Sequence, residues 1–198
     1  MPAATRSYKK VARARSEERT RSDLLDAAER AFFSGSWDKT TLEEVAADAG
    51  TTKQTLLRHF GSRDGLIKAG SERAFARISE QRMAAPADDI TGAIDNLLDH
   101  YYEVGDRALI LSAATGDNAM GEFSEAGKKF HHEWVDHAFG VWLSQRTPAE
   151  RKRVRGAVIA LCDVQSWAIL SRDLGYPRTQ VRATLITAIE SLLGEETP

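Results

Sequence analysis

Apolar residues recur every three or four positions along most of this chain, which is the spacing that places them on one face of an α-helix. The clearest example is the stretch TLEEVAADAGTTKQTLLRHF, which begins at Thr41. Glu44 follows Thr41 by three residues, as in a capping box. Gly50 then stands where a helix would end in a left-handed residue, and Thr51 or Thr52 begins a second helix. The pattern predicts two short helices joined by a tight turn.

The second of these helices has two contrasting faces. Leu56 and Phe60 lie four residues apart and form its apolar face. Its opposite face carries hydrogen-bond donors and adaptable polar groups, namely Lys53, Gln54, Thr55 and Arg58. A helix-turn-helix presents such a face to the DNA major groove, with the amino-terminal end of the second helix nearest the bases. An ordinary pair of helices with solvated charges has the same pattern, so the neighbouring sequence has to separate the two interpretations.

Helical patterns continue on both sides of this pair. An apolar stripe that includes Leu24 and Ala28 predicts a preceding helix, capped by Ser16 or Thr20. Three helices are needed for a minimal core, because a helix-turn-helix alone cannot bury both inner faces. We therefore predict a helix-turn-helix domain over residues 16–61, followed by a connecting helix over residues 62–85.

Residues 86–198 predict a larger helical domain. Pro86 interrupts the helical pattern, and no alternating segment beyond it is long enough to require a strand. Thr147 and Pro148 begin a helix that runs to Leu174, and Gly194 ends the last helix. The expected fold class is all-α, with an amino-terminal three-helix DNA-binding domain followed by a helical domain for ligand binding and dimerisation.

Charge is distributed unevenly along the chain. Residues 1–75 hold 14 basic and 11 acidic side chains, whereas the remainder holds 13 and 18. The amino-terminal part is therefore the part suited to a polyanion. Residues 1–15 have five basic side chains, no acidic one and little apolar surface, so we expect a disordered basic arm that lies along phosphates or enters a minor groove. A solubilising tail is the alternative.

Other classes of function find little support in the composition. Cys162 is the only cysteine, which excludes an intramolecular disulfide and a CxxC metal site. No apolar run approaches the roughly 18 residues needed to cross a bilayer, and the amino terminus has no apolar signal segment. We expect a cytoplasmic protein with no membrane partner and no cofactor.

The amino-terminal third resembles the TetR family of bacterial transcriptional regulators. The resemblance rests on LLDAAERAFF, TTLEEVAADAGTTKQTLLRHF and GSRDGLI, and covers about residues 20–68. It implies a homodimer, not an enzyme, that binds a partly palindromic DNA operator, usually represses, and is released by a small molecule. One position departs from the family, because Leu57 stands where members commonly carry a tyrosine that touches DNA.

The predicted DNA-binding residues fall into two groups. Lys53, Gln54 and Thr55 are the candidates for base edges, since Lys suits guanine and Gln suits adenine. The candidates for phosphate contacts are Thr41, Thr52, Arg58, His59 and Arg63. Leu57 would make an apolar contact with DNA or none.

Aromatic residues of the carboxy-terminal part could form an apolar pocket for a hydrophobic or aromatic effector. The predicted ligand-binding residues are Tyr101, Phe123, Phe130, Trp134, Trp142 and Gln165. Each aromatic residue also fits an ordinary core position. Ligand binding is expected to tilt the long connecting helix and so to change the spacing of the recognition helices. For the dimer, one face of the helix from Pro148 and the final helix would form a four-helix bundle with a second copy.

The segment HHEWVDH, His131–His137, allows a different interpretation. His132 and Asp136 lie four residues apart, as do Glu133 and His137, so either pair could share a metal ion on one helix face. There is no HExxH pattern and no third ligand in view, so we assign no metal ligands. A metal-dependent enzyme or metal sensor is therefore the alternative function, and a DNA-binding protein without an effector is another.

Overall fold

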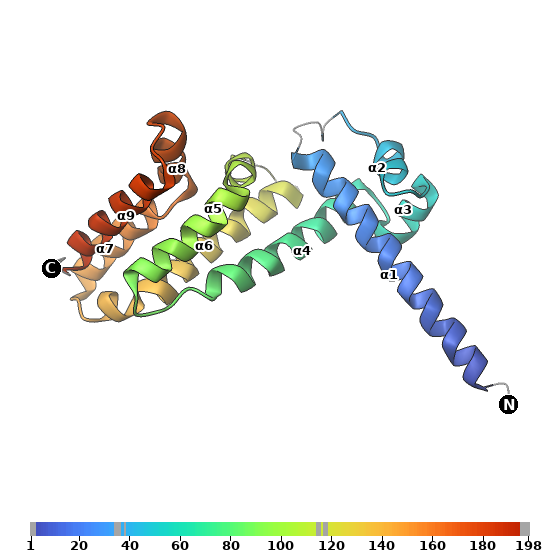
Figure 1. Ribbon diagram of the computed structural model, residues 1–198, viewed down its shortest axis with the longest axis horizontal. Coiled ribbons are helices and arrows are strands. Elements are labelled where there is room, and N and C mark those ends of the chain that lie inside the picture. Colours follow the sequence, from blue (N-terminus) through green and yellow to red (C-terminus); the bar gives the residue numbers. More distant parts are fainter. Residues whose placement is uncertain (1–2, 34–36, 38, 114–115, 117–118, 195–198) are drawn as a thin grey trace. The chain divides into compact units, whose positions relative to one another are not determined.

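The computed structural model describes residues 3–33, 37, 39–113, 116 and 119–194, and this part of the chain is helical with no strand (Figure 1). The helices are α1 (Ala3–Phe33), α2 (Leu42–Asp48), α3 (Lys53–Phe60), α4 (Arg63–Met83), α5 (Ile90–Ser112), α6 (Ala119–Ser144), α7 (Pro148–Leu161), α8 (Val164–Ala168), the π-helix η1 (Ile169–Asp173) and α9 (Arg178–Leu193). The chain divides into two compact units, Met1–Arg73 and Ala74–Pro198, here called the amino-terminal and carboxy-terminal units. The all-α prediction is confirmed.

The amino-terminal unit is built on a small apolar core where α1, α2 and α3 meet. The side chains that are almost completely buried in it are Leu24, Leu25, Ala27, Val45, Ala46, Leu56 and Leu66. Burying one leucine in this way contributes roughly 1.5–3 kcal/mol. A few such residues therefore hold the two short helices in place, because helices of this length are marginal in isolation.

Local caps define where α2 and α3 begin. The Thr41 hydroxyl accepts from the Glu44 amide at 3.2 Å, and the Glu44 carboxylate accepts from the Thr41 amide at 2.7 Å, so the predicted capping box is confirmed. Thr52 caps α3 by accepting from the Thr55 amide at 3.3 Å. Gly50 has a φ of +67°, a conformation that glycine adopts without strain. The sequence thus specifies the helix-turn-helix at short range.

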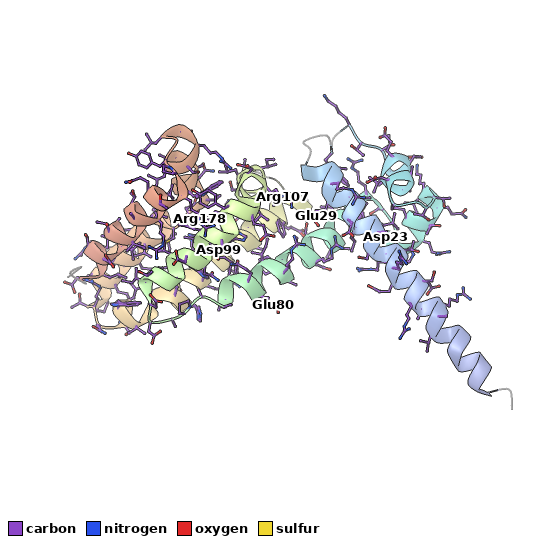
Figure 2. The ribbon with its side chains drawn as sticks, in the orientation of Figure 1. Asp23, Glu29, Glu80, Asp99, Arg107 and Arg178 are labelled. Atoms are coloured by element: carbon purple, nitrogen blue, oxygen red, sulfur yellow. The ribbon has the colours of Figure 1, made fainter. Side chains whose placement is uncertain are left out.

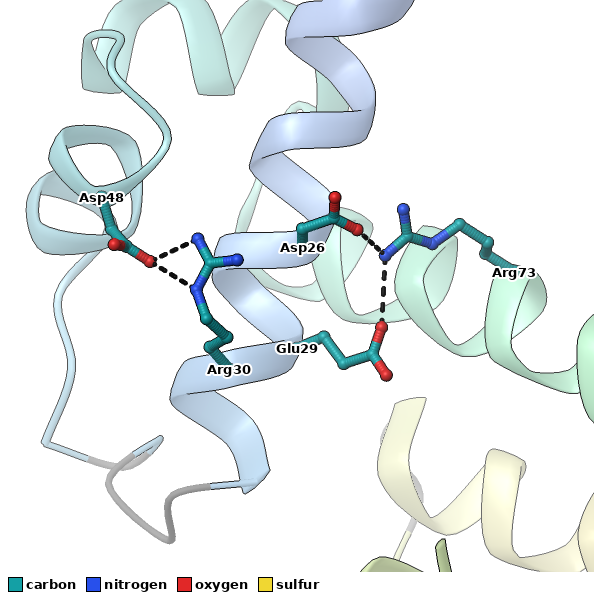
Figure 3. Close-up of polar contacts among 5 residues, drawn as sticks. All are labelled: Asp26, Glu29, Arg30, Asp48 and Arg73. Carbon is teal, nitrogen blue, oxygen red and sulfur yellow. Dashed lines mark hydrogen bonds and ion pairs between the residues drawn. The ribbon is translucent and has the colours of Figure 1, made fainter. Parts of the chain in front are cut away.

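Three ion pairs join α1 to α2 and α4 within the amino-terminal unit (Figure 3). Arg30 on α1 binds one carboxylate oxygen of Asp48 on α2 through Nε at 3.0 Å and Nη2 at 2.7 Å. Arg73 on α4 reaches back to Asp26 at 2.7 Å and Glu29 at 3.2 Å. Such partly exposed pairs each contribute about 0–1 kcal/mol, so they orient the helices more than they stabilise them.

The start of α1 differs from the sequence-based expectation. Residues 3–15 are helical instead of forming a disordered arm, and residues 1–2 lie outside the described residues. The stretch after Pro2 contains alanine and long unbranched side chains, which favour helix, and Arg13 pairs with Glu17 one turn later at 3.3 Å. Neither proposed residue caps the helix, since Thr20 donates its hydroxyl proton to the Ser16 carbonyl at 3.0 Å within α1.

The carboxy-terminal unit is a larger helical bundle. Helix α5 packs against α6, α8 and α9, and α7 packs against α6 and α9; Figure 1 shows α5, α6, α7 and α9 running alongside one another. Its fully buried large side chains are Ile94, Leu97, Leu98, Trp134, Phe139, Trp167, Leu185 and Ile189. Gly105 on α5 lets Trp167 approach closely, because a Cβ atom there would lie 2.5 Å from the tryptophan ring.

The predicted helix from Thr147 to Leu174 is interrupted. Its capping box at Thr147 is confirmed, but α7 ends at Leu161 and α8 begins at Val164. Asp163 causes the restart, because its carboxylate accepts from the Gln165 amide at 2.9 Å as an N-cap. The proposed dimer face along this helix is therefore not continuous.

Charged pairs at the surface connect α5 to the last elements of the carboxy-terminal unit. Asp99 on α5 pairs with Arg178 on α9 (Figure 2), and Asp95 accepts from Arg182 at 2.5 and 2.9 Å. In the described part of the chain, no single helix is long and apolar enough to cross a membrane. Among these helices, only α7 taken together with α8 and η1 reaches the length and apolar composition of a membrane span, and the two segments are bent by 46° relative to each other.

Candidate nucleic-acid interface and ligand cavity

The outer face of α3 carries solvent-exposed polar side chains. Thr52, Lys53, Gln54 and Arg58 are exposed, whereas Leu56 on the other side is completely buried. Gln54 and Arg58 make no side-chain hydrogen bond or ion pair with the described residues. They therefore leave an amide and a guanidinium available to an external partner.

Lys53 at the start of α3 is held by an ion pair. Its Nζ lies 2.7 Å from Glu43 on α2, and this hydrogen bond lowers the pKa of the Glu43 carboxyl from its ordinary value. Both side chains are about half exposed, and pairs of this kind are weak. Lys53 can therefore exchange Glu43 for a phosphate or a base at little cost.

Two of the three threonines predicted at the interface, Thr41 and Thr52, serve first as helix caps, and Thr55 donates its amide proton to the second cap. Thr41 donates its hydroxyl proton to the Glu44 carboxylate at 3.0 Å. The hydroxyl oxygens of Thr52 and Thr55 lie 3.2 Å apart, within hydrogen-bonding distance of each other. These residues position the amino-terminal ends of α2 and α3, where free backbone amides favour anions.

Three other predicted DNA-binding residues point elsewhere. Leu57 is half-buried against the core of the amino-terminal unit, and the Nε2 atom of half-buried His59 is shielded from solvent. Arg63 donates to the carbonyl of Thr40 at 2.7 Å and to that of Trp37, and lies over the Trp37 ring at 4.2 Å. In place of the phosphate contact expected from the sequence, Arg63 holds the connection before α2. The spacing of residues along the chain could not predict that Arg63 contacts these carbonyls, because they are distant in sequence.

A cavity of about 130 Å³ lies within the carboxy-terminal unit, lined by residues of α4, α5 and α6 together with Asp163 and Val164. Of the six predicted ligand-binding residues, Tyr101, Phe123 and Phe130 line it. Phe75 on α4 packs edge-on to Phe130 at 5.3 Å between ring centroids and to Phe123 at 6.3 Å. These rings form an apolar wall.

The other three predicted ligand-binding residues do not line this cavity. Trp134 is fully buried and donates its Nε1 proton to the Arg82 carbonyl at 3.0 Å, so it belongs to the core. Trp142 is half-buried, 6.3 Å from the Phe139 ring. Gln165 is exposed and donates to the Ser112 hydroxyl at 3.3 Å. Their helical spacing does not separate core from cavity positions.

Buried polar residues that the sequence analysis missed also line the cavity, namely Arg82, His100, Ser124 and His131. Arg82 is only 3% exposed, and its guanidinium lies over the Trp134 ring at 4.2 Å. Its Nε and Nη2 atoms are buried, and no described residue provides them with a hydrogen-bond partner. A signal was present, because Arg82 follows Ile78 by four residues and so continues the inner stripe of its helix.

Burial controls the charges around the cavity. It lowers the pKa of His100 to about 3, with a further contribution from the positive charge of Arg82, so this imidazole is neutral. Burial also lowers the pKa of His131, whose Nε2 lies 3.0 Å from the Ile159 carbonyl oxygen. The pKa of Arg82 is lowered by burial as well, but a guanidinium stays protonated in proteins. The cavity therefore presents a buried cation beside neutral imidazoles.

The histidine-rich segment of α6 gives no support to the metal alternative. Asp136 is bound by Arg155 at 2.6 Å, Glu133 lies 3.8 Å from Lys129, and the Nε2 of His137 lies 2.9 Å from the Ala85 carbonyl oxygen. Across the described residues, no group of three His, Cys, Asp or Glu side chains is placed to hold a metal ion.

Comparison with known proteins shows what the helix-turn-helix is similar to. Residues 24–69 match the family model described as bacterial regulatory proteins, tetR family. Similar curated proteins are the HTH-type transcriptional regulator AlkX of Mycobacterium tuberculosis, 30% identical over 83 residues, and TtgR of Pseudomonas putida, 37% identical over 52 residues. These matches cover 42% and 26% of this chain but only 36% and 25% of the relatives' own length.

The fold extends the likeness beyond that region. The crystal structure of a transcriptional regulator from Rhodococcus sp. Rha1 aligns with a TM-score of 0.64, covering 92% of this chain and 100% of that one at 16% sequence identity. The carboxy-terminal unit therefore shares its fold with a known regulator, although its residues have diverged.

Proposed function

We infer that this chain, whose amino-terminal unit belongs to the TetR family of bacterial regulatory proteins, is a DNA-binding transcriptional regulator that recognises its operator with α3. The observation that carries this proposal is the exposed row Lys53, Gln54 and Arg58 on the second helix of a capped helix-turn-helix. Helices of this kind enter the major groove with their first residues at the base edges.

The geometry assigns different roles to the three side chains. Gln54 has the amide that pairs with adenine at two atoms, and Lys53 suits the acceptors of guanine once it leaves Glu43. Arg58, one turn further along α3, is placed for a phosphate, which fixes register without reading sequence. Exposed arginines on the first half of α1, Arg13 and Arg15, add positive charge for the DNA backbone.

Operator recognition requires two copies of the chain. A two-fold symmetric pair must present its recognition helices about 34–36 Å apart to reach successive major grooves. Exposed apolar side chains at the start of η1 and in the turn after it support self-association: Ile169, Leu174 and Tyr176 are 51%, 54% and 38% exposed. We place part of the dimer interface there, and expect Leu174→Glu to convert the dimer to a monomer in sedimentation experiments.

The carboxy-terminal unit then acts as the sensor. A cavity of about 130 Å³ with phenylalanine walls suits a small apolar or aromatic effector, which releases a repressor from its operator in the cytoplasm. Release requires that the effector bind the DNA-free conformation more tightly than the DNA-bound one. Three residues of α4, Phe75, Ile78 and Arg82, line the cavity, so this helix is the element through which we expect a ligand to act.

Selection from a random duplex library tests the proposal directly. The purified full-length chain should enrich a two-fold symmetric motif with half-sites about one helical turn apart. A chain carrying both Gln54→Ala and Arg58→Ala should enrich none, while keeping its helical content. Recovery of unrelated sequences by the unaltered chain would contradict operator recognition.

A further inference from the structure

Arg82 is the least expected residue of the carboxy-terminal unit. It is 3% exposed, and its Nε and Nη2 atoms have no hydrogen-bond partner in the part of the chain that the structure describes. Buried charges in proteins are normally paired, because removing an ion from water is costly unless its hydrogen bonds are replaced. The Trp134 ring, 4.2 Å from the guanidinium, supplies a cation–π contact but offers no oxygen or nitrogen acceptor to Nε or Nη2.

Two further residues of the cavity lining carry a buried polar atom that is unpartnered. Ser124 Oγ and His131 Nδ1 have no hydrogen-bond partner among the described residues, and both side chains line the cavity together with Arg82. The other ring nitrogen of His131 lies 3.0 Å from the Ile159 carbonyl oxygen. Residues of α4 and α6 that carry unpartnered polar atoms therefore line the same cavity, which marks a ligand site more strongly than any one of them alone.

The cavity also has an apolar, aromatic part. Phe130 and Phe123 each meet the Phe75 ring edge to face, with 5.3 Å and 6.3 Å between ring centroids. A further ring fits such an arrangement, because edge-to-face contacts between aromatic rings are favourable. At about 130 Å³ the cavity has the scale of a single six-membered ring, since an apolar cavity of about 150 Å³ holds benzene.

We propose that this cavity binds a small aromatic carboxylate, with the carboxylate on Nε and Nη2 of Arg82 and the ring against the three phenylalanines. Adjacent guanidinium nitrogens match the two oxygens of a carboxylate, and the resulting charge-assisted hydrogen bonds are stronger than neutral ones. Ser124 donates to the same carboxylate. This assignment names the effector class of the regulator and rests on the proposed function for that biological role.

The other charged residues of the cavity are compatible with an anion. Lys128 is exposed, with its Nζ 2.6 Å from Glu125, and adds positive charge at the rim. Asp163 is the acidic residue of the lining, but one of its carboxylate oxygens accepts from the Gln165 amide at the start of α8. This bond to the amino-terminal end of a helix offsets part of its negative charge.

Calorimetric titration of the full-length protein with sodium benzoate at pH 7 tests the assignment without any substitution. Benzyl alcohol provides the ring without charge, and acetate provides the charge without a ring. We expect benzoate to bind at least about tenfold more tightly than either, the discrimination typical of a hydrogen bond to a charged group. If benzyl alcohol binds as tightly as benzoate, the proposed role of Arg82 is wrong. If acetate binds as tightly as benzoate, the proposed role of the aromatic wall is wrong.

Replacing the arginine separates a ligand anchor from a structural residue. Arg82→Met keeps the apolar contact with Trp134 and removes the charge, so benzoate affinity should fall at least tenfold while that for benzyl alcohol stays the same. The melting temperature of the ligand-free protein should stay level or rise. Arg77→Met, an exposed position on the same helix, is the matched control and should bind benzoate as the unaltered chain does.

The titrations contain no DNA, so the two proposals can fail independently. Benzoate binding by a chain that selects no DNA motif would support the site and refute the regulator. A chain that selects a motif but prefers benzyl alcohol to benzoate would retain the regulator and refute the carboxylate site. If Arg82→Met does not fold, the ligand comparison on the unaltered chain still decides.

Discussion

The two units of this protein place their polar side chains in opposite ways. In the amino-terminal unit, the polar groups of Gln54 and Arg58 face solvent, and His59 is its only described residue with a buried side-chain atom that lacks a partner. Ten such atoms lie in the described carboxy-terminal unit, among them Nε and Nη2 of Arg82. Each unmet buried group costs about 1–3 kcal/mol until something binds it.

The partners that we propose for the two units account for this difference. A DNA duplex is a large, rigid polyanion, so its contacts have to stand on the surface, where solvation of the free side chains costs nothing. A small ligand can instead be surrounded, and donors buried beside it gain strength from the low dielectric. The amino-terminal unit is therefore built for an exposed partner, and the carboxy-terminal unit for an enclosed one.

The largest expected effect comes from a substitution in the core beneath α3. Leu56→Ala should lower the free energy of unfolding of the amino-terminal unit by about 2–5 kcal/mol, because Leu56 is completely buried. Hydrogen exchange should accelerate at amides of α2 and α3. Amides of α5, α6 and α9 serve as the internal control and should keep their protection; equal acceleration throughout the chain would show that the two cores are not separable.

A smaller expected effect is the dependence of the stability of the carboxy-terminal unit on pH. Because burial lowers the pKa of His100 from 6.5 to about 3, the folded state binds fewer protons than the unfolded chain between these values. The stabilisation is present above pH 6.5 and is lost as the pH falls towards 3. At pH 4.5 the loss amounts to about 2–3 kcal/mol.

Urea unfolding at pH 7 and pH 4.5 measures this difference. His100→Gln should lose less stability between the two values than the unaltered chain, by about the amount above. His132→Gln, at an exposed position, is the control and should follow the unaltered chain. Identical pH dependence of the His100 variant and the unaltered chain would mean that this imidazole titrates normally in the folded state.

The smallest effects come from the capping boxes, of which each unit has one. Thr41→Ala and Thr147→Ala should each reduce stability by about 1 kcal/mol, since each removes the hydroxyl that accepts from an amide in the first turn. Only Thr41→Ala should also weaken DNA binding, because it loosens α2 beside α3. Equal loss of DNA affinity from Thr147→Ala would contradict the division of roles between the units.

Features of the fold that depend on nearby residues could be predicted from the sequence. The capping boxes at Thr41 and Thr147, the turn at Gly50 and the end of the last helix at Gly194 are each set within a few residues. The interruption at Asp163 was missed because the apolar spacing continues through it. Only the structure shows that its carboxylate starts a new helix.

The residues of the candidate sites divide in the same way, into those that local spacing predicts and those that depend on tertiary packing. Gln54 and Arg58 lie exposed on α3 as helical spacing predicts, because a short helix with one buried leucine has only one outer face. Arg63 instead meets the carbonyls of Trp37 and Thr40, more than twenty residues away. The cavity around Arg82 brings together α4, α5, α6 and the start of α8, so its lining depends on packing that no local pattern specifies.

The most direct test of operator recognition by α3 is a binding titration of the selected operator and all its single-base variants, with the unaltered chain, Gln54→Ala and Arg58→Ala. We expect Gln54→Ala to lose about 1–3 kcal/mol of discrimination at one base pair in each half-site and to leave the others unchanged. Arg58→Ala should weaken binding to every sequence alike and reduce the salt dependence by about one counterion per half-site. A uniform loss for Gln54→Ala, with every base preference intact, would contradict the reading of DNA by α3.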